Sequence, residues 1–447
     1  MQNVKINLPQ GAYEVLEKLN SAGFESYAVG GCVRDSLLLK NPEDWDVTTK
    51  ATPEKVVELF SPDVILTGLK HGTVTVRHKG KNYEVTTFRS DGKYVDSRHP
   101  ESVGFVSRIE EDLKRRDFTV NAMAYSEKSG LIDLYGGLSD LKNGILRAVG
   151  NPEERFCEDA LRILRGVRFV STTGFSIEEN TLKAMLKSVD GLKKVSAERV
   201  FLEMDKMLLG DYAEKALLVA PEIIFAVIPE MRKCYKFLQR SKWHLHDVYT
   251  HTVIATKSVR QDRALRWCML LHDIAKPDKF FLDDVGEGHF YGHPELSFEM
   301  ADKILTRLKM PNKLKNEVLI LIKNHDVYLP TEKKKIKRQL YKFGEDILLK
   351  LLEVKFADNQ GQGTQLALAE NEKLFQIKDC VQKVVDSGEC YSLKTLAVSG
   401  KDVLELGFSG EMVGKVLDAL LKDVIDENIP NERQRLIKSI LSRREKF

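Results

Sequence analysis

The sequence lacks the features that mark secreted, membrane-spanning or zinc-thiolate proteins. Its six cysteines are scattered without a Cys-x-x-Cys pair, which argues against a disulfide framework and against a thiolate zinc site. The start, MQNVKINLPQ, holds no apolar run typical of a signal peptide, and the most apolar later segment is interrupted by Pro221, Glu222 and Pro229. We therefore expect a cytoplasmic chain that keeps its thiols reduced and does not enter a membrane.

The sequence also lacks internal repeats, low-complexity tracts and a dominant charge. The 447 residues carry a net charge of only +3, so a surface for nucleic acid must be a local patch. With 43% hydrophobic and 30% charged residues, the composition is typical of soluble globular proteins. The length predicts about three domains.

Helix and strand patterns alternate up to residue 150, and helical patterns dominate afterwards. A helical pattern at residues 12–19 leads to a strand YAVGG, a helix VRDSLLL and a strand around Asp46; TVTVRHKGKNYEVTTFR then alternates like a hairpin that turns at residues 79–81. Pro152 marks a helix start, and apolar patterns of period 3.6 continue to the C-terminus. We predict an α/β head with a small mixed sheet, followed by an all-helical body.

The segment NPEDWDVTTK places two carboxylates one residue apart in a predicted strand. Asp44 and Asp46 would point to one face, because side chains alternate along a strand. Such a pair holds divalent cations, and two cations clamp the attacking and leaving oxygens of a phosphoryl transfer. Glu84, predicted in mid-strand among apolar neighbours, is the candidate third ligand. On its own the pair is more often a surface feature or a cap.

A glycine pair upstream is a candidate phosphate-binding turn. YAVGGCVRDSLL predicts a strand that runs into Gly30 and Gly31 and then a helix. Backbone N–H groups approach phosphates closely at such a turn, and Arg34 adds positive charge. A simple tight turn is the alternative.

Four ordered motifs carry a family resemblance: GGCVRDSLLL with DWDVTT, YEVTTFR, RRDFTVNAMAY and EDALRILRGVRF. Together they resemble the class II tRNA nucleotidyltransferase and bacterial poly(A) polymerase family, in the polymerase-beta superfamily of nucleotidyltransferases. The resemblance implies that Asp44 and Asp46 bind catalytic Mg²⁺ and that Glu84 is the third carboxylate. It also implies that ribose and triphosphate are recognised by Arg116, Asp117 and Asn121.

The motif EDALR suggests how a base is selected. Asp159 and Arg162 are three residues apart on a predicted helix and would share one face. A carboxylate accepts from the exocyclic amine of cytosine or adenine and a guanidinium donates to the adjacent ring nitrogen, whereas guanine and uracil fail both contacts. We expect selection of CTP and ATP without a template; a surface ion pair is the alternative. Arg165 and Arg168 continue the stripe toward phosphates or solvent.

Three further segments extend the resemblance. Residues 89–106 form a polar loop; in the family such a loop helps the switch from C to A, which argues against an enzyme that adds only CC. LIDLYGGLSDLKNGILRAVG resembles the next family motif, although its residues alone indicate only a strand and a turn. In SAERVFLEMDKML, Ser196 reads as a helix N-cap.

Histidine and aspartate recur in the predicted helical body, in the segments DVYTHTV, LLHDIAKPDKF, YGHPELS, IKNHDVYL and VKFADNQGQG. Neutral imidazoles and carboxylates on facing helices are the ligands of zinc, manganese, iron or nickel, although a lone core histidine is usually structural. The arrangement resembles the HD superfamily of metal-dependent phosphohydrolases. The resemblance implies a transition metal or Mg²⁺ and removal of 2′,3′-cyclic or terminal phosphate from RNA ends. The implied primary ligands are His251, His272, Asp273 and Asp358, with His293 and His325 for a second ion.

The C-terminal region resembles a terminal helical module of the family. Glycines at 400, 407, 410 and 414 are expected to open helix N-termini that meet tRNA phosphates, and the basic run at residues 333–338 is either a patch for the tRNA backbone or a solvated helix face. We predict a catalytic head at 1–150, a base-recognising neck at 151–235, an HD domain at 236–375 and a tRNA-contacting module at 376–447.

The resemblance implies addition of CCA to tRNA 3′ ends from CTP and ATP, with no membrane partner. An enzyme that adds only A, only CC or a poly(A) tail is the close alternative. An RNA-end phosphohydrolase with a non-catalytic head is the alternative from another class.

Overall fold

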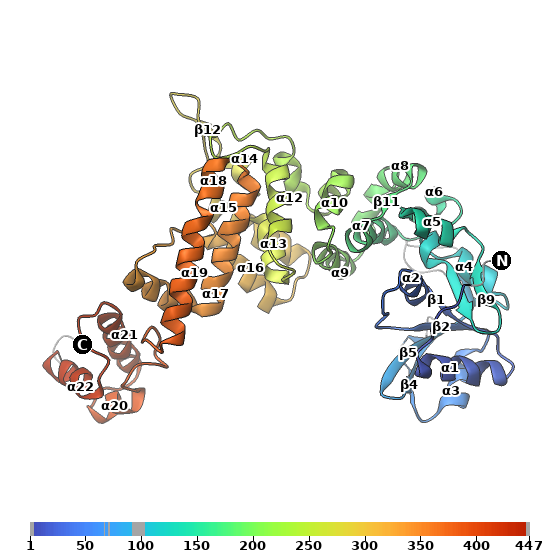
Figure 1. Ribbon diagram of the computed structural model, residues 1–447, viewed down its shortest axis with the longest axis horizontal. Helices are drawn as coiled ribbons and strands as arrows, with labels where there is room; N and C mark the ends of the chain where they lie inside the picture. Colours follow the sequence, from blue (N-terminus) through green and yellow to red (C-terminus); the bar gives the residue numbers. More distant parts are fainter. Residues whose placement is uncertain (1–3, 67, 70–71, 92–102, 444–447) are drawn as a thin grey trace. The chain divides into compact units, whose positions relative to one another are not determined.

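The computed structural model describes residues 4–66, 68–69, 72–91 and 103–443, in two compact units. The first unit is Met1–Arg232 and the second is Lys233–Phe447 (Figure 1). Among the described residues, no helix has the length and apolar character needed to cross a membrane.

A seven-stranded mixed sheet forms the centre of the first unit, as predicted for the head. The strand order is β3-β4-β5-β2-β1-β8-β9, in which β2 and β5 run parallel and the other neighbours antiparallel. The parallel pair places Asp46 opposite Glu84. The strands are β1 (Ser26–Val29), β2 (Asp46–Thr49), β3 (Val64–Ile65), β4 (Thr73–His78), β5 (Lys81–Thr87), β8 (Met123–Ser126) and β9 (Gly130–Asp133).

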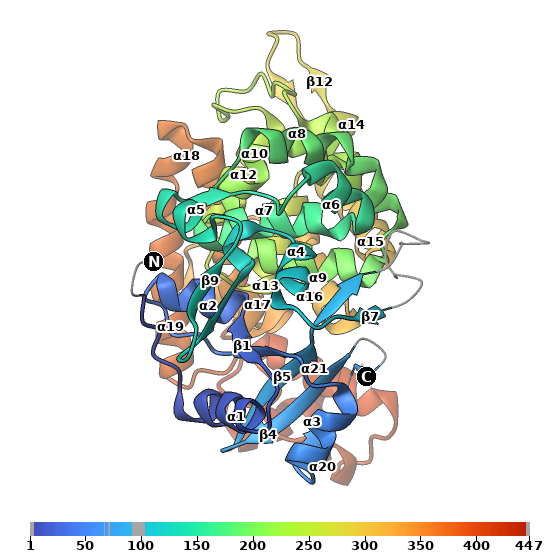
Figure 2. The ribbon, with the colours of Figure 1, turned by 90° about the vertical axis from the view of Figure 1, so that its right-hand side faces the viewer.

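Short helices cover this sheet and follow its strands. Helices α1 (Gln10–Ser21) and α3 (Pro53–Phe60) pack against each other and against strands, and Figure 2 shows them beside β4 and β5. All four residues of β1 are buried, so both faces of the sheet are covered at its centre. The predicted hairpin turn is confirmed: Lys79 and Gly80 both have positive φ, as a two-residue type I′ turn requires.

The rest of the first unit is mainly helical. Helix α7 packs against α9 and α10 and carries most of the candidate arginines. The helices are α2 (Gly31–Leu37), α4 (Ile109–Lys114), α5 (Gly137–Asn143), α6 (Pro152–Glu158), α7 (Leu161–Thr173), α8 (Glu179–Lys187), α9 (Ala197–Leu208), α10 (Ala213–Val219) and α11 (Pro221–Val227).

Two strand pairs lie beside the main sheet of this unit. Strand β10 (Ile145–Leu146) pairs in parallel with β11 (Ser176–Ile177), so strands do not end at residue 150. Strands β6 (Arg89–Asp91) and β7 (Val103–Phe105) pair at the two ends of the predicted loop, whose residues 92–102 lie outside the described part.

The second unit is a helical body with one small hairpin, so the prediction of an all-helical body is wrong in this detail. Strand β12 (Phe281–Leu282) pairs with β13 (Gly288–His289). Helix α17 is bent at Gly344, which has φ 73°, and packs against α12 and α19. The helices are α12 (Val248–Ser258), α13 (Arg263–Leu271), α14 (Lys276–Lys279), α15 (His293–Arg307), α16 (Asn312–Asn324), α17 (Lys333–Gln362), α18 (Gln365–Ala369) and α19 (Asn371–Asp386).

Three C-terminal helices enclose their own apolar core: α20 (Gly400–Glu405), α21 (Glu411–Ile425) and α22 (Arg433–Ser442). The predicted places of the glycines are right at two positions and wrong at two. Gly400 begins α20 and Gly410 caps α21, but Gly407 follows the end of α20 and Gly414 lies inside α21.

Acids far away in the sequence neutralise most of the basic run at the start of α17. Lys333 and Lys337 both pair with Glu389, and Arg338 pairs with Asp426. Because these ion pairs fix the chain to itself, they favour a structural role for the run over an open phosphate-binding patch.

Candidate active sites in the two units

The three predicted acids lie near the start of β2 and in the middle of β5, but in the described part of the chain their ligand atoms do not form one close set. Asp46 and Glu84 are register partners on the parallel strands, while Asp44 lies just before β2 rather than within it. The surrounding protein shields Asp46 from part of the solvent and, with the charge of Glu84, raises its pKa to about 6 against the opposing charge of Arg116. The edge is therefore an acidic site with a guanidinium nearby.

The trio is more open than a closed metal site. Within the described ranges, the sets of three or more possible ligands whose atoms lie within 4.8 Å of one another are both in the second unit. Oxygen-rich carboxylate sites of this kind suit Mg²⁺, so the residues fit the predicted ion by chemistry.

The glycine turn next to the trio is confirmed as strand, turn and helix. Gly30 has φ 80°, and a Cβ there would lie 3.0 Å from Nη1 of Arg116. Glycine is therefore needed both for the backbone conformation and for the approach of Arg116. Arg34 of the following helix donates to Oδ1 of Asn121 at 2.6 Å.

Asp112 holds the arginine at this turn and was not predicted. Its buried carboxylate lies 2.8 Å from Nη2 of Arg115 and 3.2 Å from Nη2 of Arg116. Burial acts against the charge of Asp112, but the two arginines outweigh it and lower the pKa. An isolated aspartate among glutamates gives no sequence signal for this role.

Arg165 and Arg168 of α7 are partly buried and pair with acidic side chains, while contact with phosphate stays a prediction. Arg165 donates from Nε to Asp117 at 2.8 Å, and Arg168 lies 2.8 Å from Glu203. Three guanidinium groups lie over the ring of Phe169, at 4.4 Å (Arg168), 5.2 Å (Arg34) and 5.5 Å (Arg165) from its centroid. Glu203 and Phe169 were not predicted, because tertiary packing alone brings them to this cluster.

The predicted helical spacing of Asp159 and Arg162 is wrong. Helix α6 ends at Glu158, and Asp159 has the extended backbone angles φ −143° and ψ 102°. Its carboxylate accepts from Leu161 N–H at 3.1 Å and from Arg199 at 2.7 Å.

Arg162 is buried and donates to backbone carbonyls and to Glu158 rather than to Asp159. The break between the helices turns these two side chains toward separate partners. Their role in base selection stays a prediction.

Breaking the ion pair between Asp117 and Arg165 should destabilise the first unit. Burial opposes the charge of Asp117, but Arg165 outweighs it and lowers the pKa of Asp117 to about 2. We expect Asp117→Asn to cost about 3 kcal/mol of unfolding free energy at pH 7. Because the folded-state pKa is depressed, this difference should shrink as the pH falls from 3.8 toward 2.

Urea unfolding followed by Trp45, the tryptophan of the first unit, measures this difference. Glu179→Gln removes an exposed carboxylate that pairs with Lys183 and should cost less than about 1 kcal/mol. Equal costs for the two variants would contradict the importance of the buried pair.

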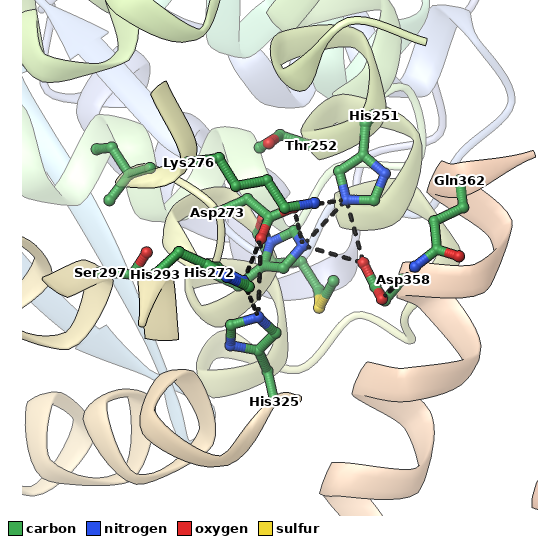
Figure 3. Close-up of polar contacts among 12 residues, drawn as sticks. His251, Thr252, His272, Asp273, Lys276, His293, Ser297, His325, Asp358 and Gln362 are labelled. Atoms are coloured by element: carbon green, nitrogen blue, oxygen red, sulfur yellow. Dashed lines mark hydrogen bonds and ion pairs between the residues drawn. The ribbon is translucent and has the colours of Figure 1, made fainter. Parts of the chain in front are cut away.

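Four predicted ligands in the second unit converge on one point (Figure 3). Nε2 of His251 lies 3.0 Å from Oδ2 of Asp273 and 3.1 Å from Oδ1 of Asp358. Nε2 of His272 lies 3.2 Å and 3.4 Å from the same two oxygens. Ligand atoms about 3 Å apart match the spacing around one ion with bonds of about 2.1 Å.

A second set shares Asp273. Its Oδ1 lies 3.2 Å from Nε2 of His293 and 3.7 Å from Nε2 of His325, and these two nitrogens are 3.0 Å apart. Both rings donate from Nδ1 to a backbone carbonyl, at 2.9 Å from His293 and 2.7 Å from His325. Their Nε2 lone pairs therefore face each other, an arrangement that a cation between them relieves.

The pKa values of His272 and His325 show how strongly the charges within this cluster act on one another. Burial opposes the charge of His272, but Asp273 and Asp358 outweigh it and raise its pKa to about 10. Burial and the nearby charge of His272 lower the pKa of His325 to about 3. The carboxylates thus favour positive charge at the centre of this cluster, as a cation-binding site requires.

Helix packing brings Asp358 to this cluster. A Cβ at Gly361, one turn further along α17, would lie 2.7 Å from the carbonyl oxygen of His251. The absence of a side chain there allows α17 to approach α12 closely.

A buried lysine lies beside the ligands at one end of a cavity of about 400 Å³. Nζ of Lys276 lies 2.7 Å from Asp273 and also contacts Gln239 at 3.0 Å and His244 at 3.1 Å. Burial, and then the charge of Lys276, lowers the pKa of His244 to about 3. The neutral ring can therefore accept a hydrogen bond from Nζ of Lys276. The roles of Gln239 and His244 were not predicted.

Three family descriptions match parts of the chain. Residues 26–147 match "Poly A polymerase head domain", residues 174–234 match "Probable RNA and SrmB- binding site of polymerase A", and residues 293–440 match "tRNA nucleotidyltransferase domain 2 putative". Three of the second-unit ligands, His251, His272 and Asp273, lie outside these ranges.

Similar proteins cover either half of the chain or nearly all of it. A CCA-adding enzyme of Streptococcus gordonii is 52% identical over 208 residues, so the chain spans about half (52%) of that relative's length. A CCA-adding enzyme of Geobacillus stearothermophilus is 36% identical over 438 residues, which are 97% of each chain. The crystal structure of the Bacillus stearothermophilus CCA-adding enzyme in complex with CTP has a TM-score of 0.72 and 31% identity, and covers 98% of both chains. The chain therefore belongs to the family of CCA-adding enzymes.

Proposed function

We propose that this chain adds C, C and A to the 3′ end of tRNA from CTP and ATP. Its similarity to CCA-adding enzymes along 97% of the length supports this activity. The single structural observation that carries the proposal is the pairing of Asp46 with Glu84 on parallel strands, beside a glycine turn that holds Arg116.

In the proposed reaction, the tRNA 3′-hydroxyl oxygen bonds to the α-phosphorus of the nucleotide. The bond from that phosphorus to the bridging oxygen breaks, pyrophosphate leaves, and the hydroxyl proton passes to solvent. Asp44, Asp46 and Glu84 would hold Mg²⁺, which neutralises charge on the reacting phosphate oxygens. Arg116 and Arg34, fixed by Asp112 and Asn121, would orient the triphosphate.

Base selection by Asp159 and Arg162 requires a local change of partners. Asp159 must release Arg199, and Arg162 must turn its guanidinium from Glu158 toward the base. The cost of these exchanges would be offset only by a base that satisfies both groups, which favours cytosine and adenine.

Three tRNA transcripts, ending before CCA, after C and after CC, test the proposal. With CTP and ATP together we expect every transcript to be completed to CCA; with ATP alone, only the transcript ending in CC should gain one residue. Addition of A alone, of CC alone, or of a long A tail would identify the corresponding alternative enzyme.

We propose a second activity for the second unit: hydrolysis of a 2′,3′-cyclic or terminal phosphate at an RNA end. The two ligand sets that share Asp273, and Lys276 beside them, support this function. Water would bond to phosphorus, the ester bond would break, and the released oxygen would take a proton from water. A divalent ion bound by these residues supplies Lewis acidity for that attack.

The finer division of the chain is also a proposal. We assign catalysis to residues 1–150, base recognition to 151–235, phosphate hydrolysis to 236–375 and tRNA contact to 376–447. Separate apolar cores around α17 and α19 and around α21 support a distinct C-terminal module. The predicted boundary at 376 is wrong in position, because Ile377, Val381 and Val384 of α19 pack in the first core and the second core begins at Cys390.

A further inference from the structure

Three aromatic side chains form a cluster at the β12–β13 hairpin of the second unit. The rings of Phe281 and His289, which are register partners, lie 5.4 Å apart. Tyr291 lies 5.4 Å from His289, with an angle of 18° between the ring planes, and 5.5 Å from Phe281. Tyr291 is 73% exposed. The His289 and Tyr291 rings are thus nearly parallel, whereas the Phe281 ring is tilted by 30° and 48° against them. The hairpin lies at the end of the unit where α14 lies (Figures 1 and 2).

Hydrogen bonds of Asp283 and close backbone packing at Gly288 fix the position of this hairpin. The carboxylate of Asp283 accepts from Nε2 of His289 at 2.8 Å and from Glu287 N–H at 2.8 Å. Gly288 N–H donates to the carbonyl of Arg240, and a Cβ at Gly288 would lie 2.1 Å from the carbonyl oxygen of Gln239. The hairpin is therefore fixed to the segment whose Gln239 side chain binds Lys276.

Two residues of the aromatic cluster, His289 and Tyr291, line the cavity that also reaches the ligand cluster. Trp243 and Tyr291 are exposed parts of its lining, whereas Asp273, Lys276 and the second-ion histidines are buried parts. Its volume of about 400 Å³ lies within the usual range of small-molecule sites. A ligand with an anionic group for Lys276 and a flat apolar group for the aromatic side chains would match this lining.

We propose that Tyr291, with His289 and Trp243, stacks on the base of a nucleotide whose phosphate lies against Lys276 and the ligand cluster. The proposal rests on the phosphohydrolase function proposed above and adds the part that distinguishes nucleotides from other phosphate esters. Stacking tolerates every base because each has a π face. The site therefore accepts nucleoside phosphates of any base and discriminates against base-free phosphate esters.

Hydrolysis of adenosine 2′,3′-cyclic phosphate and of glycerol 1,2-cyclic phosphate, which has no base, tests the proposal. We expect Tyr291→Ala to raise the KM of the adenosine substrate at least about fivefold, with kcat and the base-free reaction unchanged. Tyr291→Phe should restore the wild-type KM. Tyr328→Ala, at a tyrosine that is 79% exposed, should have no effect. An unchanged KM in Tyr291→Ala would overturn the proposal.

A binding measurement separates this proposal from the hydrolytic function. Trp45 and Trp267 are buried, whereas Trp243 is 37% exposed, so the difference between wild type and Trp243→Phe isolates its fluorescence. We expect adenosine 3′-monophosphate to quench this signal, and Tyr291→Ala to weaken the quenching.

A parallel measurement with an oligonucleotide that ends in a 3′-phosphate shows whether the site binds RNA ends or only free nucleotides. Quenching without hydrolysis of any substrate would remove the hydrolytic function and retain the stacking site. Hydrolysis without quenching, and with a KM independent of Tyr291, would remove the stacking site.

Discussion

Asp46→Asn should lower the rate of nucleotide addition by about 10³-fold, while hydrolysis at the second unit continues. The change keeps the shape of the side chain but removes one charge from the acidic edge where Asp46 and Glu84 are register partners. Loss of an ionic metal ligand removes several kcal/mol of transition-state stabilisation, and about 4 kcal/mol corresponds to that factor. Single-turnover addition of labelled CTP to tRNA measures the effect.

Stability measurements show whether Asp46→Asn loses nucleotide addition through a change in chemistry or through unfolding. The folded protein raises the pKa of Asp46 from 3.8 to about 6, so at pH 7 the ionised group opposes folding, and Asp46→Asn should not lower the melting temperature. Asp63→Asn removes an exposed acid from the same unit and should retain full activity. Unchanged addition in Asp46→Asn would remove the head site from the mechanism; if the wild type adds no nucleotide but hydrolyses RNA ends, the phosphohydrolase alternative gains support.

Asp273→Asn should abolish metal binding and hydrolysis in the second unit, with CCA addition altered less than about twofold. Asp273 is 1% exposed and belongs to both ligand sets, so one substitution affects both proposed ions. Its Oδ2 also forms an ion pair with Nζ of Lys276, at 2.7 Å. We expect hydrolysis to fall at least about 10³-fold, since two ligand sets lose an anionic member.

Metal content by mass spectrometry and hydrolysis of a 2′,3′-cyclic RNA end measure this prediction. Asp302→Asn changes an exposed carboxylate on α15, the helix that begins with His293, and should keep both metal and activity. Wild-type metal content in Asp273→Asn would rule out the proposed coordination.

The sequence patterns predicted the head well where short-range geometry decides the result. Alternation along the strands and the turn at residues 79–81 were sufficient to predict the hairpin. The parallel pairing that places Glu84 opposite Asp46 joins distant segments, so the role of Glu84 was suggested by the family resemblance. The position of Asp159 was mistaken because a 3.6-residue period assumes a continuous helix. No glycine or proline marks the break at Asp159; an N–H of Leu161 and the guanidinium of Arg199 stabilise it.

The pattern of histidine and aspartate predicted which side chains converge in the second unit, whereas the charge pattern left the role of the basic run open. The ligand residues were predicted from histidines and aspartates on successive helices together with the resemblance to HD phosphohydrolases, and four of them do converge. The basic run at residues 333–338 was ambiguous because its partners, Glu389 and Asp426, lie about fifty to ninety residues away and only folding brings them near.

Phe169 has a further consequence for how the first unit responds to acidity. Three guanidinium groups surround one phenyl ring, and guanidinium stays protonated at every pH a cell experiences. The cation–π contacts at this ring should therefore be insensitive to acidity. The neighbouring ion pair of Arg165 with Asp117 should weaken only in acid strong enough to protonate the carboxylate, whose pKa the guanidinium lowers.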